Sequence, residues 1–159
     1  MVLPERKHPR LKNFDYSQNG CYHLTLCIKD RRLILSRIIP APTPMMRAQV
    51  QLSGAGRIVE KYIRNISGVY PQVTVEKYAI MPNHVHLLLL LDQGCETSVQ
   101  TVVRSLKRMV TRELGKSVWQ SSFYDVVIRN DAMYQCEWQY IDGNPDKWTE
   151  DDLYVSDCL

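Results

Sequence analysis

Hydrophobic residues along this 159-residue chain follow two periods, and each period predicts a different kind of element. Residues 21–28 place apolar side chains at alternate positions, which is typical of a strand with one buried face. Residues 83–91 are almost continuously apolar and predict a strand inside a sheet, buried on both faces. Strands are expected, in chain order, over residues 21–28, 32–36 (a short continuation or a hairpin partner), 47–53, 73–81, 83–91 and 123–129.

Other segments carry apolar residues three or four positions apart, the spacing of one helix face. The clearest is 97–114, which Gly115 follows at the position that favours a left-handed helix end. A later helix is expected to begin at Asn130 or Asp131, whose side chains can cap it, and to end near Asp142. The predicted helices cover residues 55–67, 97–114, 130–142 and 148–153 (short and terminal).

The order of these elements predicts the fold class. With the hairpin treated as an edge addition, the order is strand, helix, strand, strand, helix and strand, and one helix closes the chain. This is the ferredoxin-like, or split βαβ, plan of the α+β class, an antiparallel sheet with helices on one face plus a C-terminal helix. Chain length and the lack of a linker-like segment predict a single domain over residues 1–159, with a basic N-terminal arm over residues 1–20.

Two histidines on the most apolar strand are the strongest chemical signal. His84 and His86 lie two residues apart and therefore share one face of the strand, with their bases roughly 6.5–7 Å apart. From there two rings can lean toward one cation at roughly 2.1 Å each. Because burying two bare imidazoles among leucines and valines is costly, we expect a metal ion at this position.

A catalytic metal needs a third protein ligand, and the last long helix offers one. Tyr140 and Asn144 lie four residues apart on one helix face, so the Asn144 amide oxygen can reach the metal while the phenol reaches a substrate beside it. A phenol can attack a phosphodiester and form a covalent phosphotyrosine, and the cation stabilises the developing charge. Two imidazoles, one amide oxygen and water suit Mn²⁺ or Mg²⁺, although Co²⁺, Ni²⁺ or Zn²⁺ would also accept imidazole ligands.

The chain is mildly basic, with 20 basic and 17 acidic residues and a formal charge of +3. This balance fits a nucleic-acid partner without requiring one. Basic side chains gather near the N-terminus and along the helix at 97–114, where an extended DNA strand would favour them; a solvated helix face is the other interpretation. The candidate DNA-binding residues are Arg6, Lys7, Arg10, Lys12, Arg104, Lys107, Arg108 and Arg112.

Further features bear on location and on other candidate residues. The five cysteines form no CxxC pair, no apolar leader follows the first basic residues, and no apolar run could span a bilayer. We therefore expect reduced thiols and a cytoplasmic protein without a membrane partner, nucleoid-associated when bound to DNA. His8 and His23 are expected to have no functional role, and Trp119 is expected to pack in the core rather than stack on a base.

Five segments between about residues 10 and 150 together form a specific pattern. They are Asn13–Gly20, Tyr78–Leu87 with His84-Val85-His86, Ser105–Lys107, Trp119–Asn130, and Tyr140-Ile141 followed by Asn144-Pro145. In these segments the chain resembles the single-tyrosine HUH transposases, named for a histidine, hydrophobic residue, histidine motif. It is similar in particular to their REP-associated tyrosine transposase branch.

The resemblance implies a ferredoxin-like palm with the pair His84 and His86 on a central strand, where Asn144 joins them as a metal ligand. It implies Tyr140 as the nucleophile. The implied substrate is single-stranded DNA, often presented as a hairpin from a repeated extragenic palindrome. The implied reaction is strand nicking and rejoining through a 5′-phosphotyrosine, which releases a 3′-hydroxyl. Relatives commonly carry a histidine where this chain has Val126, so its rate or specificity is expected to differ.

Two other functions stay open. A domesticated hairpin-DNA-binding protein would keep the fold and lack turnover. A metallohydrolase for a small phosphate or nucleotide would use water as its nucleophile. The sequence also leaves open whether the protein is a monomer or a homodimer that exchanges helices, and hence whether Tyr140 acts in cis or in trans.

Overall fold

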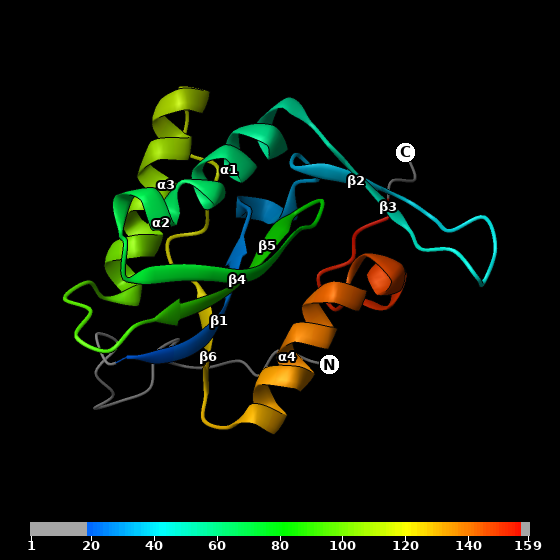
Figure 1. The fold of residues 1–159 in the computed structure, drawn as a ribbon. Helices are drawn as coiled ribbons and strands as arrows, with labels where there is room; N and C mark the ends of the chain where they lie inside the picture. The colour runs from blue at the N-terminus through cyan, green and yellow to red at the C-terminus, as the bar shows by residue number, and fades with distance from the viewer. Residues whose placement is uncertain (1–18, 157–159) are drawn as a thin grey trace.

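The computed structural model describes residues 19–156, so the predicted basic arm lies almost entirely outside the described residues (Figure 1). The strands are β1 (Gly20–Cys27), β2 (Ser36–Ile39), β3 (Gln49–Leu52), β4 (Val73–Ile80), β5 (His84–Leu91) and β6 (Tyr124–Ile128). The helices are α1 (Gly54–Arg64), α2 (Ile66–Val69), α3 (Val99–Leu114) and α4 (Asp131–Gly143), with two 3₁₀ turns, η1 (Lys29–Arg31) and η2 (Pro145–Glu150).

Four strands form one antiparallel sheet in the order β4-β5-β1-β6. The central pair is β1 and β5, which run from Gly20 opposite Leu91 to Cys27 opposite His84. The strand that carries the two histidines is therefore internal to the sheet, as predicted. The sheet and its helices confirm the α+β, ferredoxin-like plan.

The two faces of the sheet have different surroundings because side chains alternate along each strand. On β1, Leu24 and Leu26 are fully buried in the main core with residues of α1 and α3, and His23 and Thr25 face the other way. The second face is covered by α4, where a smaller apolar cluster includes Ile141, the one buried residue among the described residues of this helix. Figure 1 shows α1, α2 and α3 on one side of the sheet and α4 on the other.

The prediction that residues 32–36 continue the first strand or pair with it is wrong. Asp30 and Arg31 have φ angles of 59° and 52°, so the chain makes a left-handed turn after β1 instead of doubling back along it. The next strand begins at Ser36 and pairs with β3, and these two strands form a separate sheet. The weaker strand prediction at 47–53 corresponds to β3 and is confirmed.

Two helix predictions also differ from the structure. The helix predicted over 55–67 is divided at Asn65, where α1 ends and α2 begins. The helix predicted over 148–153 is replaced by the 3₁₀ turn η2, which starts at Pro145 because proline has a fixed φ and no N–H to continue α4. Asp151 after this turn has an extended backbone.

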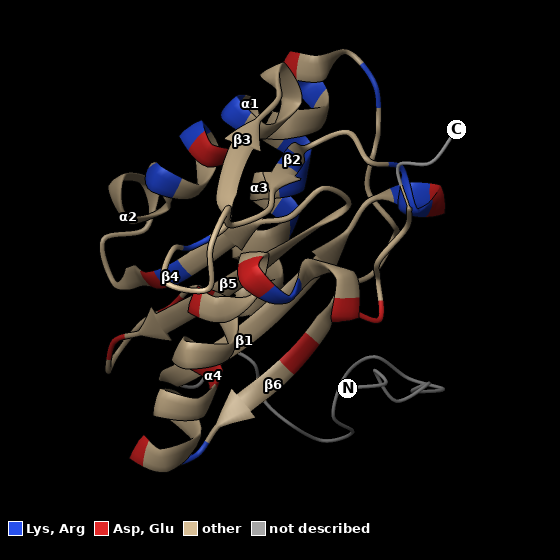
Figure 2. Ribbon diagram, turned by 90° about the vertical axis from the view of Figure 1, so that its right-hand side faces the viewer, with Lys and Arg blue, Asp and Glu red and all other residues tan. Residues whose placement is uncertain are grey.

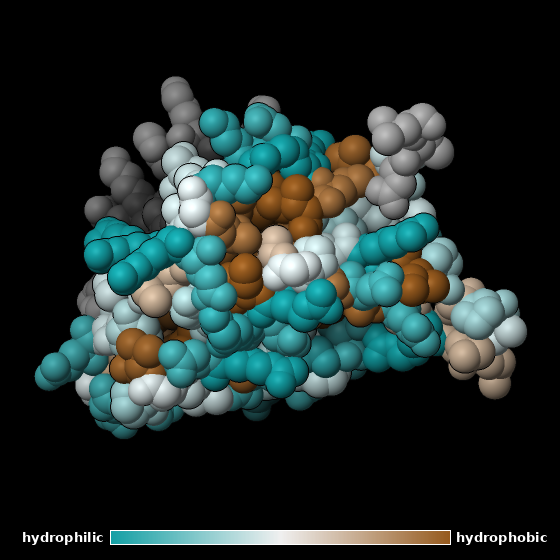
Figure 3. Space-filling model, turned by 90° about the horizontal axis from the view of Figure 1, so that it is seen from above, coloured by the Kyte–Doolittle hydropathy of each residue, from teal (hydrophilic) through white to brown (hydrophobic). Residues whose placement is uncertain are grey.

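The β2–β3 hairpin projects from the rest of the molecule, and the end of its loop next to β3 is tied to the end of α4 and to η2. In Figure 3 the hairpin forms the projection at the right, and Met45 in its loop is 94% exposed. Arg47 Nη1 donates to Asp142 Oδ2 at 3.0 Å, and the Ala48 backbone N–H donates to Asp146 Oδ1 at 2.7 Å. These contacts fix the C-terminal end of α4 against the hairpin.

Two general predictions can be compared with the described residues. Cys21, Cys27, Cys95 and Cys136 are free. Within residues 19–156 no helix has the length and apolar character needed to cross a membrane.

A substitution at Gly56 tests how tightly α1 packs against the backbone at Leu35. A Cβ atom at Gly56 would lie 2.0 Å from the backbone oxygen of Leu35, which cannot rotate aside. We expect Gly56→Ala to lower the free energy of unfolding by about 1–3 kcal/mol, measured by urea titration. Gly54→Ala is the matched control, because a Cβ there meets nothing within 4 Å. Equal losses in the two variants would contradict this packing.

Candidate metal centre beside a tyrosine helix

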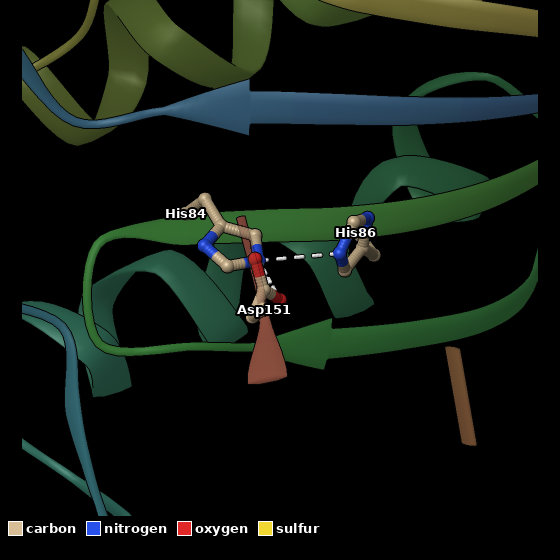
Figure 4. A group of neighbouring side chains, drawn as sticks. All are labelled: His84, His86 and Asp151. Atoms are coloured by element: carbon tan, nitrogen blue, oxygen red, sulfur yellow. Dashed lines mark hydrogen bonds and ion pairs between the residues drawn. The ribbon is translucent and has the colours of Figure 1, made fainter. Parts of the chain in front are cut away.

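Strand β5 presents His84 and His86 on the sheet face that α4 covers, and Figure 4 shows the two rings beside Asp151. Both side chains are buried, and their Nε2 atoms lie 3.2 Å apart. Asp151 approaches the pair from the segment after η2, with its Oδ2 atom 3.5 Å from His84 Nε2. One ligand atom from each of the three residues lies within 4.8 Å of the others, a spacing that fits a single ion.

Hydrogen bonds on the far side of the rings determine which nitrogens carry protons. Asn83 Oδ1 lies 2.8 Å from His84 Nδ1. Because an amide oxygen only accepts, His84 carries its proton on Nδ1 and presents an unprotonated Nε2 to the centre of the cluster. On the second ring, His86 Nδ1 lies 3.1 Å from Thr25 Oγ1 and 3.0 Å from His23 Nε2.

Asn144 completes the set of possible ligands. It is buried at the end of α4, and its Nδ2 donates to Asp151 Oδ2 at 3.1 Å. Its Oδ1 is buried and has no hydrogen-bond partner among the described residues, which costs about 1–3 kcal/mol for a polar group. A cation bound by this oxygen would remove that cost. Two imidazole nitrogens, a carboxylate oxygen and an amide oxygen together fit a divalent metal ion.

Tyr140 stands on α4, one turn before Asn144, at the open side of this cluster. Its ring centroid lies 5.4 Å from that of His86 and 5.9 Å from that of His23, and 38% of the residue is exposed. One chain therefore brings the phenol and the possible metal ligands together. The hollow beside them, of about 230 Å³, is lined by Gln139, Tyr140, Gly143, Asn144, Lys147, Glu150, Asp151 and Asp152.

Burial controls the charge of these groups. Burial lowers the pKa of His84 to about 4, against the opposing charge of Asp151. Burial also lowers the pKa of His86, and the neighbouring imidazoles add to this shift. Both rings are therefore neutral at pH 7, the state that binds metal. Burial raises the pKa of Tyr140 to about 12, and the carboxylates of Asp151 and Asp152 contribute, so the free phenol keeps its proton.

Sequence reasoning missed two residues of this cluster. His23 was expected to have no role, yet its imidazole lies against both His86 and Tyr140. Its alternation with Thr25 along β1 was visible in the sequence, but the pairing that sets β1 beside β5 was not. Asp151 was missed because its position depends on η2, a turn that no local pattern predicted. His8, which was also expected to have no functional role, lies outside the described residues.

The basic residues predicted to bind DNA do not all lie on one exposed surface. Arg104, Arg108 and Arg112 are exposed and form one stripe along α3. Lys107 instead ties α3 to the following loop, because its Nζ donates at 2.8 Å to two backbone carbonyls in residues 120–122. Four further candidates lie outside the described residues: Arg6, Lys7, Arg10 and Lys12.

A groove of about 450 Å³ lies between α3 and the loop after it. The loop reaches the end of β1, where the Gln120 N–H donates to the Cys27 carbonyl at 2.9 Å, and Cys27 pairs with His84. The groove and the metal cluster thus lie at the same end of the sheet. Trp119 packs in the core, as expected. The groove is lined by Lys107, Arg108, Thr111, Arg112, Ser117, Trp119, Gln120 and Ser121.

Charge is unevenly distributed over the helices. Figure 2 shows basic segments on α1 and α3, while the charged segments of α4 are acidic. The sequence of α4 contains three acidic residues and no lysine or arginine. The helix that carries Tyr140 therefore adds no positive charge for a phosphate, and Lys147 is the one basic residue among those that line its hollow.

The chain is similar in sequence to known transposases. The model of the family described as "Transposase IS200 like" matches residues 16–144. An uncharacterised protein of Haemophilus influenzae is 30% identical over 178 residues, which span 96% of this chain and 95% of that protein. The REP-associated tyrosine transposase of Escherichia coli K12 is 24% identical over 133 residues, which span 83% of this chain and 70% of that protein.

Two solved structures share the fold. A REP-associated tyrosine transposase bound to a REP hairpin superposes with a TM-score of 0.68 at 22% identity, over 87% of this chain and 73% of that chain. A proposed transposase from Deinococcus radiodurans R1 gives a TM-score of 0.51 at 19% identity, over 84% of this chain and 97% of that chain.

The low pKa of His84 predicts acid sensitivity of the metal-free fold. Between its folded value of about 4 and its ordinary value of 6.5, the unfolded chain binds a proton that the folded chain does not. The free energy of unfolding therefore falls as pH drops through this window, by roughly 2–3 kcal/mol between pH 7 and pH 4.5 in urea titrations. His84→Gln lacks this group and should lose less; the same loss in both proteins would argue against a neutral His84.

Proposed function

Because the chain belongs to the IS200-like transposase family, we propose that it nicks and rejoins single-stranded DNA in a metal-dependent reaction with Tyr140 as the nucleophile. The observation that carries this proposal is the position of the Tyr140 ring, 5.4 Å from the ring of His86 at the open side of the possible metal ligands. The phenol is partly exposed, so a phosphodiester can approach it from solvent.

The reaction exchanges one phosphodiester for another. Tyr140 loses its phenolic proton and its oxygen attacks the scissile phosphorus. The bond from phosphorus to the 3′ oxygen breaks, and that oxygen leaves as a hydroxyl after it takes up a proton. The 5′ end remains attached as a phosphotyrosine diester. A 3′-hydroxyl can later attack this diester and rejoin the strand without ATP.

Burial and charge determine what the residues of the site do in this scheme. The raised pKa of Tyr140 keeps the phenol protonated until positive charge is brought beside it. A bound ion such as Mg²⁺ or Mn²⁺ would supply that charge and would stabilise the charge that develops on the phosphate. Lys147 lines the same hollow and offsets the surrounding carboxylates. The residues that would hold the ion are His84, His86, Asn144 and Asp151.

We infer that the DNA substrate contains a hairpin. The relative from Escherichia coli is named for its association with REP, and a solved structure of similar fold holds a REP hairpin. In this chain, the stripe of Arg104, Arg108 and Arg112 offers positive charge to a phosphate backbone. A strand that leaves the groove beside α3 and passes around the end of β1 would reach the cluster at His84.

The same geometry supports action in cis. Tyr140 and the four possible ligands come from one chain, so a homodimer is not required for a complete site. We infer that the enzyme works in the cytoplasm on nucleoid DNA.

The tyrosine reaction predicts a covalent adduct. Wild-type protein incubated with Mn²⁺ and hairpin oligonucleotides from repeats that flank its gene should give a protein–DNA band on a denaturing gel. Tyr140→Phe, or addition of a chelator, should abolish that band. Tyr134→Phe is the matched control on the same helix, because its hydroxyl bonds Glu76 and does not face the metal ligands.

Two outcomes of that experiment would overturn the proposal. Cleavage that survives Tyr140→Phe and gives no adduct would indicate water as the nucleophile, as in a metallohydrolase. Hairpin binding without cleavage by the wild type would indicate a domesticated DNA-binding protein.

The stripe on α3 predicts salt-dependent binding. We expect the double change of Arg108→Ala and Arg112→Ala to weaken hairpin binding and to reduce the slope of log Kd against log salt by about 2, one for each lost phosphate contact. Fluorescence anisotropy between 50 and 200 mM salt measures both effects. Arg64→Ala on α1 is the control, since its guanidinium already pairs with Glu60 at 3.1 Å. A slope that is unchanged in the double variant would contradict this interface.

A further inference from the structure

A series of three side chains leads from α4 to the candidate metal centre. Glu137 on α4 accepts a hydrogen bond from His23 Nδ1, and His23 Nε2 lies 3.0 Å from His86 Nδ1. Both histidines are buried, and their ring centroids are 5.0 Å apart. The series passes from the helix to β1 and from β1 to β5. It ends at His86 Nε2, which faces His84.

The carboxylate of Glu137 sets the direction of these hydrogen bonds. A carboxylate only accepts, so the single proton of a neutral His23 ring lies on Nδ1. His23 Nε2 then has a lone pair and accepts from the N–H at His86 Nδ1. Thr25 Oγ1, 3.1 Å from the same nitrogen, can accept from it as well. His86 Nε2 is consequently left without a proton, as metal binding requires.

Without this carboxylate, hydrogen bonds that run in the opposite direction would satisfy the same ring nitrogens of His23 and His86. His23 would carry its proton on Nε2 and donate to His86 Nδ1, and His86 would carry its own proton on Nε2. That N–H would point at His84 Nε2, 3.2 Å away, and form an ordinary hydrogen bond. The bond would occupy the lone pair that an ion needs. The two directions therefore correspond to an open and a closed metal site.

We propose that Glu137, acting through His23, holds His86 in the tautomer whose Nε2 is free to bind a metal. The inference rests on the proposed function for the role of His86 as a ligand. Glu137 and His23 are positioning residues, since their contacts lead to the ligand and not to the substrate. Glu137 lies three residues before Tyr140 on α4. The hydrogen bond from His23 to Glu137 therefore links the packing of α4 on the sheet to the tautomer of His86.

The isosteric change Glu137→Gln tests this role. A glutamine can accept or donate, so it fits both directions of the series. In the metal-free wild type, ¹⁵N–¹H spectra of the histidine rings should show the His86 proton on Nδ1, and in Glu137→Gln part of the population should move to Nε2. The Mn²⁺ affinity without DNA, followed by electron paramagnetic resonance, should fall by the reciprocal of the fraction of rings that keep the proton on Nδ1, about twofold for an even division of the two tautomers.

Tyr134→Phe is again the matched control. It removes another hydrogen bond between α4 and the sheet, from Tyr134 Oη to Glu76 at 2.8 Å, and leaves the series of Glu137, His23 and His86 intact. We expect the wild-type tautomer and the wild-type Mn²⁺ affinity in this variant.

The outcomes separate this inference from the proposed function, because neither readout uses DNA. An unchanged His86 tautomer together with unchanged Mn²⁺ affinity in Glu137→Gln would overturn the inference. An equal loss in Tyr134→Phe would overturn it too, since the effect would then belong to the docking of α4 alone. A wild type that shows the expected tautomer and forms no adduct with DNA would instead overturn the proposed function and leave the inference standing.

Discussion

Two imidazole nitrogens are held 3.2 Å apart on the buried face of the sheet that α4 covers, and the surrounding residues are arranged around this pair. When neither nitrogen carries a proton, their lone pairs repel at that distance unless a cation lies between them, and burial removes the water that would separate them. Asn83 fixes the ring of His84, and its own Nδ2 donates to the Leu153 carbonyl at 2.7 Å. The β1–β5 register holds the second ring, since Thr25 lies directly opposite His86. The stabilising apolar burial comes mainly from the other face, where α1 and α3 cover the main core.

Local periodicity predicted the parts of the molecule in which neighbours in sequence decide the structure. The apolar run of β5 and the spacing of His84 and His86 gave the central strand and its shared face. The spacing of Tyr140 and Asn144 predicted that both side chains would lie on that face, at α4 and its end. A cap at Asn130 or Asp131 was also predicted, and the side chain that accepts from the Met133 N–H, at 2.9 Å, is that of Asn130.

The remainder depends on contacts between segments far apart in the chain. Nothing near His23 in sequence indicates that Glu137 and His86 flank it, because that arrangement requires both the sheet order and the docking of α4. Asp151 enters the cluster only because η2 turns the chain back. The structure also bears on Val126, the position at which relatives commonly carry a histidine. Val126 lies directly opposite His23 in the β1–β6 pairing, so this part of the face carries an imidazole from the neighbouring strand.

The attachment of α4 has a consequence for local stability. Among its described residues only Ile141 is buried, and polar ties hold much of the rest, including the 2.6 Å contact of Lys77 with Asp142 and the 3.0 Å contact of Arg47 with the same carboxylate. Such ties are screened by ions, whereas the apolar layer under α1 and α3 is not. We therefore expect rising ionic strength to loosen α4, the helix that carries Tyr140, before it affects the main core. One face of the sheet is thus held mainly by apolar burial, the other depends more on polar contacts, and the possible metal ligands lie on the second.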